Sequence, residues 1–106
     1  MSGQREHYRI KYADRERLWL TVSESRLAIH DLSEGGVCVD KTPAFKEGLP
    51  PQEVAVVFPD SSVFLTTAVF VRNNDSGTVI RFLKHLPLAL ILAEQRRLRL
   101  LFRDVD

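Results

Sequence analysis

Cysteine is almost absent from this sequence, in which Cys38 is the only one among 106 residues. A single thiol excludes an internal disulfide and a cysteine-rich metal site. An excess of one charge is also lacking, because 15 lysines and arginines stand against 14 acids. The chain therefore has no overall basic field of the kind that attracts nucleic acid, and no DNA partner is expected.

Long apolar runs are missing as well. The longest covers residues 86–93, whereas a membrane-spanning helix needs roughly 20 consecutive apolar residues. The polar start, residues 1–4, has no apolar core of a signal peptide. These absences predict a cytoplasmic protein without a membrane span.

Patterns that signal catalysis are not found either. The sequence has no Ser–His–acid arrangement, no metal-ligand spacing and no glycine-rich loop of the P-loop type. His7 and His30 lack the spacing and the carboxylate partners of a metal site. We therefore expect a protein that is not an enzyme and that holds neither a cofactor nor a metal.

Short β-branched and aromatic segments separated by polar turns make up most of the chain. Because no helix alternates with them, they predict a mainly β protein, a small antiparallel barrel of six to seven strands. The expected extended segments are residues 8–12, 18–22, 26–32, 37–39, 53–58, 63–72 and 78–83.

The pattern changes from strand to helix at residue 88. Strong helix formers continue to about Leu101, and Pro87 suits a first helical turn. An apolar stripe that includes Leu88, Ile91 and Leu92 is expected to cover one barrel opening. A basic, amphipathic helix of this kind is also compatible with binding a membrane surface or a partner. The whole chain, 1–106, is then one domain, with a flexible arm (1–8), a barrel (9–84) and a C-terminal α-helix (86–102).

The turn at residues 31–36, Asp-Leu-Ser-Glu-Gly-Gly, is the most polar corner of the predicted barrel. Asp31 and Ser33 offer side-chain hydrogen-bond acceptors and a donor, and the lack of a Cβ at Gly36 permits close approach of a ligand. A hairpin turn without a binding role is the alternative. Upstream, Arg5 and Arg9 are four residues apart, and the guanidinium group suits both phosphate and aromatic rings.

Together, R-x-x-x-R (Arg5, Arg9) and the later D-x-S-x-x-G (Asp31, Ser33, Gly36) resemble the two motifs of the PilZ domain family. PilZ domains are split β-barrels that bind the bacterial second messenger cyclic di-GMP. The resemblance covers most of the chain. It implies that the two arginines contact phosphate and stack on guanine, that Asp31 and Ser33 bind guanine and ribose edges, and that Gly36 leaves room for the ligand.

Four further residues are candidate ligand contacts. Tyr8 and Gly35 lie inside the two motifs. Phe70 lies on the strand that carries a guanine-stacking aromatic residue in some PilZ domains, and strand alternation predicts that Arg72 shares its face. A packing role is the alternative for Phe70. Gln4 occupies a position where many members of the family have a further arginine. Whether one or two ligand molecules bind to each chain is therefore left open.

The resemblance implies a receptor in which cyclic di-GMP orders the N-terminal arm and alters a surface for an unidentified protein partner. Such receptors control motility, biofilm formation, exopolysaccharide synthesis or virulence. Charge-assisted hydrogen bonds of about 1.5–3 kcal/mol each and base stacking of about 1–3 kcal/mol per base predict micromolar binding. One alternative is an adaptor that binds no nucleotide and acts through protein contacts, for example in type IV pilus assembly. A barrel that binds single-stranded nucleic acid is a weaker one.

Overall fold

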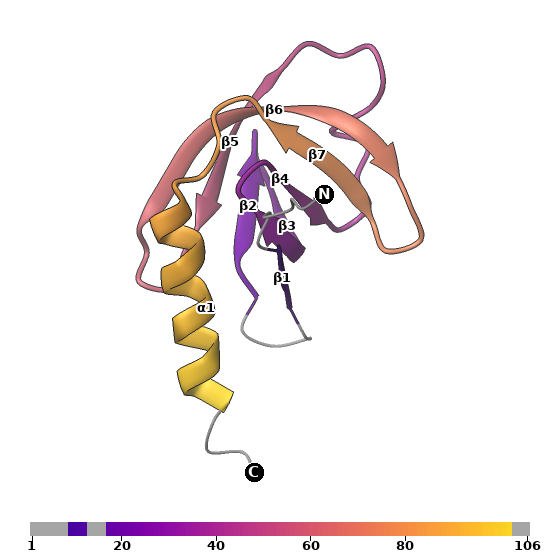
Figure 1. Ribbon diagram of the computed structural model, residues 1–106. Coiled ribbons are helices and arrows are strands. Elements are labelled where there is room, and N and C mark those ends of the chain that lie inside the picture. The colour runs from indigo at the N-terminus through magenta and orange to yellow at the C-terminus, as the bar shows by residue number, and fades with distance from the viewer. Residues whose placement is uncertain (1–8, 13–16, 103–106) are drawn as a thin grey trace, which may run out of the picture.

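The computed structural model describes residues 9–12 and 17–102, the last of these without its side chain. The predicted arm, residues 1–8, with the candidate contacts Arg5 and Tyr8, lies outside the described residues. Seven strands precede one helix (Figure 1): β1 (Arg9–Lys11), β2 (Trp19–Val22), β3 (Ser25–Ser33), β4 (Gly36–Val39), β5 (Gln52–Val57), β6 (Val63–Asn73), β7 (Thr78–Phe82) and α1 (Leu88–Phe102).

The strands form one antiparallel sheet in the order β1-β3-β2-β5-β6-β7-β4, and a further pairing between β3 and β4 closes it. Closure is possible because β3 is long. Its first half, Ser25–Ala28, pairs with β2, and its second half, Ile29–Ser33, pairs with β4. The short β1 is added to the free edge of that second half. The prediction of an antiparallel barrel of six to seven strands with a C-terminal helix is confirmed.

Alternation along the strands fills the barrel with branched side chains. Leu20, Val56 and Ile29 are fully buried, as are Ile80 and Phe82 of β7. Each such side chain contributes about 1.5–3 kcal/mol when it leaves water. The β2–β3 hairpin needs only a two-residue loop, in which Ser23 has a φ of 52°.

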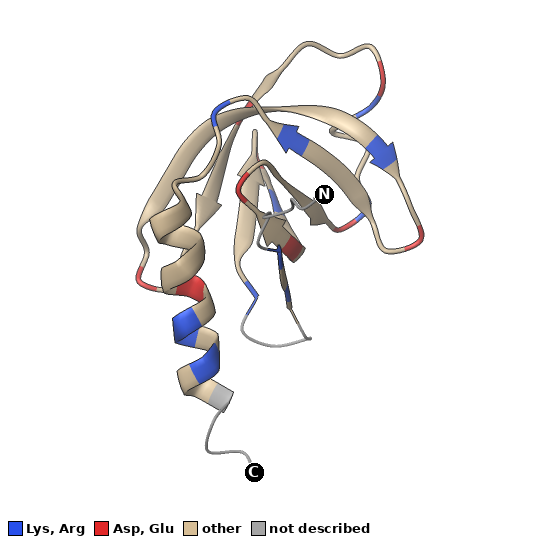
Figure 2. Ribbon diagram, viewed as in Figure 1, with Lys and Arg blue, Asp and Glu red and all other residues tan. Residues whose placement is uncertain are grey.

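Helix α1 packs against the barrel beside the β5–β6 turn, and its basic residues lie in its C-terminal half (Figure 2). Ile91 is fully buried and Leu98 is partly buried. The predicted stripe is wrong in part, because Leu88 and Leu92 are 42% and 40% exposed. The helix is rotated so that a charged residue, Glu94, faces the barrel. No helix in the described ranges is long and apolar enough to cross a membrane.

Glu94 is only 4% exposed, and two partners compensate its burial. The Tyr12 hydroxyl, just after β1, donates a hydrogen bond of 2.6 Å to Glu94 Oε2. Arg97 donates to both carboxylate oxygens, at 2.9 and 2.6 Å. Burial, followed by the hydrogen bond to Glu94 and its negative charge, raises the pKa of Tyr12 well above its usual range. The network joins the β1 end of the barrel to α1.

Candidate functional site

A β-bulge in β3 decides which way Asp31 points. Ile29 is opposite Val39 of β4, and both are buried inside the barrel. Strict alternation would direct Asp31 inward as well. The register shifts after Ile29, however, so that His30 has no opposite residue and Asp31 is opposite Cys38, on the outer face. One additional residue thus places this carboxylate outside the barrel.

A second bulge does the same for Arg72 in β6. Phe70 is opposite the buried Ile80, whereas Arg72 is opposite Val79, and Val71 between them has no opposite residue. Neighbouring residues of β7 point to opposite faces, so Phe70 faces the core and Arg72 faces outward. The expectation that these two residues share a face is wrong for this reason.

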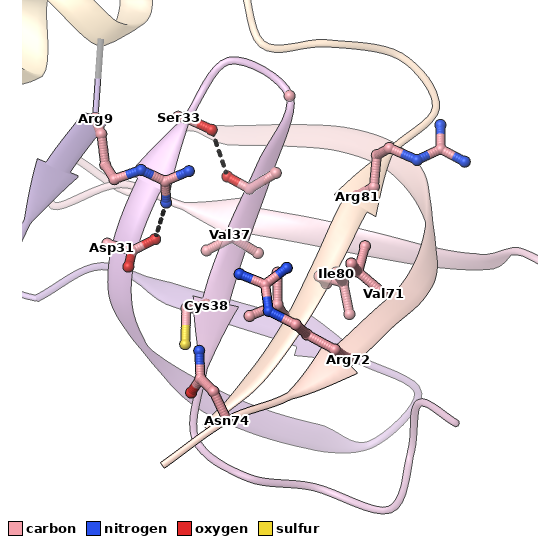
Figure 3. A pocket seen from close by; sticks show the side chains of 13 residues that line it. Arg9, Asp31, Ser33, Val37, Cys38, Val71, Arg72, Asn74, Ile80 and Arg81 are labelled. Carbon is pink, nitrogen blue, oxygen red and sulfur yellow. Dashed lines mark hydrogen bonds and ion pairs between the residues drawn. The ribbon is translucent and has the colours of Figure 1, made fainter. Parts of the chain in front are cut away.

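Both bulges border the same outer pocket, which has a volume of about 250 Å³ (Figure 3). It lies over the paired strands β4 and β7, with β1 and β3 on one side and β6 on the other. Its lining residues are Arg9, Asp31, Ser33, Gly35, Gly36, Val37, Cys38, Val71, Arg72, Asn74, Val79, Ile80 and Arg81.

The pocket is positively charged although the whole chain has a net charge of only +1. Three arginines from three strands line it, Arg9, Arg72 and Arg81, against one carboxylate, Asp31. Arg72 extends over β4 towards Cys38, whereas Arg81 points away from the centre (Figure 3). Within the described part of the chain, neither Arg72 nor Arg81 has an ion-pair partner. Guanidinium groups without a carboxylate partner favour an anionic ligand.

Arg9 and Asp31 form an ion pair across the pocket rim, with 2.7 Å between Nη1 and Oδ1. The strands position them: Arg9 is opposite Ser33 and Lys11 is opposite Asp31 in the β1–β3 register. The Arg9 side chain is 54% exposed and the Asp31 side chain 22%. An exposed pair of this kind contributes about 0.2–1 kcal/mol, so a ligand can separate it at little cost.

The turn between β3 and β4 is held by the end of β7 and the segment that follows it. The carbonyl oxygens of Glu34 and Gly35 accept hydrogen bonds of 2.8 Å from the backbone N–H groups of Leu86 and Phe82. Ser33 is 8% exposed, and its hydroxyl donates to the Gly36 carbonyl at 3.3 Å. The corner is therefore a rigid wall of the pocket.

Gly36 has a structural reason to lack a side chain. A Cβ on this residue would lie 2.5 Å from the carbonyl oxygen of Ile80, in the neighbouring strand β7. At Gly35 the nearest atom would be Nε2 of the His85 side chain, at 3.4 Å. Close approach of β7 thus explains the glycine at position 36 independently of any ligand.

Cys38 forms part of the pocket floor and is 3% exposed. Burial raises the pKa of its thiol, and the negative charge of Asp31 raises it further. The group is therefore a neutral thiol at neutral pH and an unreactive part of the site.

The structure brings together most of the predicted contacts. Arg9, Asp31, Ser33, Gly36 and also Gly35 and Arg72 all line the one pocket. Phe70 does not line it and packs against the hydrophobic core. Arg81 and Asn74 were not predicted. Alternation with the buried Ile80 and Phe82 would have placed Arg81 on the outer face, but only the strand order brings it beside Gly36.

Within the described residues, no group of three His, Cys, Asp or Glu side chains is placed to hold a metal ion. In comparisons with known proteins, no family model matches this chain, and no curated protein matches it either. The geometry of the pocket therefore carries the functional argument.

Proposed function

We propose that this protein is a PilZ-like receptor that binds cyclic di-GMP in the outer pocket. The observation that carries the proposal is the convergence of Arg9, Asp31, Ser33 and Gly36, from two separate motifs, on one positively charged pocket. The two bulges also support the proposal, because bulges frequently direct side chains towards functional sites. A turn with no binding role would need neither the outward carboxylate nor the unpaired Arg72.

The chemistry of the pocket suits one half of a guanine dinucleotide. Arg72 and Arg9 supply charge-assisted donors to a phosphate, and the Asp31 carboxylate accepts hydrogen bonds from the N–H edge of guanine. Sites for whole drug-sized ligands are about 300–1,000 Å³. At about 250 Å³ the pocket encloses only part of the dinucleotide, and the remainder extends beyond it. Arg5, outside the described residues, is proposed as a second phosphate contact from its spacing to Arg9 alone.

The proposed signal is an ordering of the segment that precedes Arg9 when the ligand binds. Arg9 belongs both to β1 and to the pocket, so its contact with phosphate fixes the point at which that segment joins the barrel. A ligand shifts a conformational equilibrium when it contacts one state better than the other. The altered surface would then be recognised by a partner protein in control of motility, biofilm, exopolysaccharide or virulence.

An adaptor that acts only through protein contacts is the second candidate. The observation that favours it is the set of exposed leucines on α1, since Leu88, Leu92, Leu100 and Leu101 are each 40–52% exposed. Binding of cyclic di-GMP distinguishes the two candidates.

The test is calorimetric titration of the full chain with cyclic di-GMP. Arg9→Ala and Arg72→Ala each remove a charge-assisted contact of about 1.5–3 kcal/mol, so each should weaken binding by about 10- to 150-fold. Arg99→Ala is the matched control, because Arg99 is exposed on α1 and does not line the pocket. It should bind like the parent chain.

Cyclic di-AMP serves as the control ligand, since it has the same phosphates but lacks the guanine edge that Asp31 would recognise. Absence of binding by the parent chain, or parental affinity in both pocket variants, would contradict the proposal. Circular dichroism of each variant verifies that the barrel is folded.

A further inference from the structure

The turn between β6 and β7 holds the Asn74 side chain in one orientation. Asn74 Oδ1 accepts hydrogen bonds of 2.8 and 2.9 Å from the backbone N–H groups of Ser76 and Gly77. The backbone N–H of Asn74 donates to the Gly77 carbonyl oxygen at 2.9 Å. Because these bonds engage the oxygen of the side-chain amide, its nitrogen lies on the other side and is the group presented outside the turn.

The turn itself is fixed to the barrel. A Cβ on Gly77 would overlap the carbonyl oxygen of Val39, so the backbone of the turn packs directly against β4. Thr78 is fully buried, and its hydroxyl donates to Asn73 Oδ1 at 2.7 Å. Asn74 therefore has a defined place at the pocket wall.

The Asn74 amide nitrogen points towards Cys38 on the pocket floor, towards which Arg72 also extends (Figure 3). Within the described residues, no protein group accepts a hydrogen bond from this nitrogen. The turn explains the oxygen of the side chain but not the nitrogen, since an aspartate would supply the same acceptor. Asparagine at position 74 thus directs a donor without a protein partner into the pocket.

Arg72 and Asp31 lie at opposite ends of the pocket. In strand register Asp31 is opposite Cys38 on β4. Cys38 is opposite Val79 on β7, which is opposite Arg72 on β6. Three strand spacings, roughly 14 Å along the sheet, therefore separate the backbones of the acid and the arginine. Asp31 is paired with Arg9, and no second carboxylate among the described lining residues offsets the charge of Arg72.

We infer that Arg72 and Asn74 form an oxyanion subsite that holds one phosphate group, in which Asn74 positions a phosphate oxygen. A guanidinium fork and an amide nitrogen together offer at least three N–H donors, which suits the oxygens of a tetrahedral phosphate. Arg9 binds phosphate only when its ion pair with Asp31 opens, whereas Arg72 and Asn74 need no such change. The inference deepens the proposed function and rests on it in one respect, that the ligand of the pocket carries phosphate.

The first test is an NMR titration of the full chain with inorganic phosphate, observed at the side-chain amides of asparagine. Asn74→Asp identifies the Asn74 signals by their absence. These signals should shift and saturate, whereas those of Asn73 should stay in place, because Asn73 is opposite the buried Thr78 and does not line the pocket. Sodium chloride at equal ionic strength is the control and should move neither amide. No shift at Asn74, equal shifts of both amides, or the same shift with chloride would each overturn the inference.

The second test is calorimetric titration with cyclic di-GMP. Asn74→Asp keeps the oxygen that the turn needs and replaces the donor with a negatively charged acceptor. It should weaken binding by at least about tenfold. Asn73→Asp is the matched control, because it adds the same charge one residue away and keeps the oxygen that Thr78 contacts. It should bind like the parent chain.

The two tests separate this inference from the proposed function. If Asn74→Asp binds cyclic di-GMP as tightly as Asn73→Asp does, the subsite is wrong although the receptor function stands. If the parent chain binds no cyclic di-GMP, the receptor function is wrong, and saturable phosphate shifts at Asn74 alone still support the subsite.

Discussion

Removing the Tyr12 hydroxyl tests the network that joins β1 to α1. Tyr12→Phe keeps the ring and deletes one hydrogen bond, 2.6 Å long, to a carboxylate that is 4% exposed. Hydrogen bonds to charged groups contribute about 1.5–3 kcal/mol, and water cannot replace a donor at so buried an atom. Because Arg97 still holds Glu94, we expect the lower part of this range, a loss of about 1.5–2 kcal/mol in the free energy of unfolding at pH 7.

The same residue predicts a dependence on pH above the ordinary tyrosine pKa of about 10. In the folded chain the pKa of Tyr12 is raised, so the phenol keeps its proton while the unfolded chain loses it. The unfolded state then binds fewer protons, and stability falls as the pH rises above 10, by up to about 1.4 kcal/mol per pH unit. Tyr12→Phe has no phenol at this position and lacks this loss. The difference in free energy of unfolding between the parent and Tyr12→Phe should therefore shrink between pH 10 and 11.

Urea unfolding followed by fluorescence of Trp19, the only tryptophan, measures both effects. Glu53→Gln, a change at an exposed acid with no ion pair in the described ranges, is the control and should unfold like the parent. Equal stability of Tyr12→Phe and parent at pH 7 would refute the assigned hydrogen bond. A deficit that stays constant up to pH 11 would refute the raised pKa.

Three other predictions concern single positions. Gly36→Ala should destabilise the fold by about 1–3 kcal/mol, because its Cβ meets the Ile80 carbonyl, while Gly35→Ala should change stability little; urea unfolding compares the two. Ser23→Gly should stabilise by about 0.5–1 kcal/mol in the same assay, because glycine has no penalty at a φ of 52°. Cys38 should react slowly with an alkylating reagent in the folded chain and rapidly in urea, and fast labelling without denaturant would contradict its burial.

Strand positions could be predicted from the sequence because each strand of the barrel buries only one of its two faces. Alternation of apolar and polar residues then marks each strand, and turn residues mark its ends. The direction of individual side chains could not be predicted where a strand contains a bulge. An additional residue leaves no mark in the pattern, so Arg72 was assigned to the face of Phe70, which the register contradicts.

Contacts between residues that are far apart in the sequence are the second feature that the sequence alone does not predict. Glu94 is a charged residue on a helix, and its sequence surroundings favour exposure to solvent. Only the fold shows that Tyr12, 82 residues away, is its partner. The two motifs, in contrast, each contain several candidate contacts at short spacing, so the sequence alone indicates Arg9, Asp31, Ser33 and Gly36, which the fold brings to one pocket.

The bulges at His30 and Val71 mean that the outer pocket depends on strand register as much as on residue identity. If β3 lost its bulge while keeping its length, every letter of D-x-S-x-x-G would remain, and yet regular alternation from Ile29 would turn the Asp31 carboxylate towards the barrel interior. A change of register can therefore remove or create such a site without any change in its motif, and comparisons of similar barrels should align strand register before they compare residues.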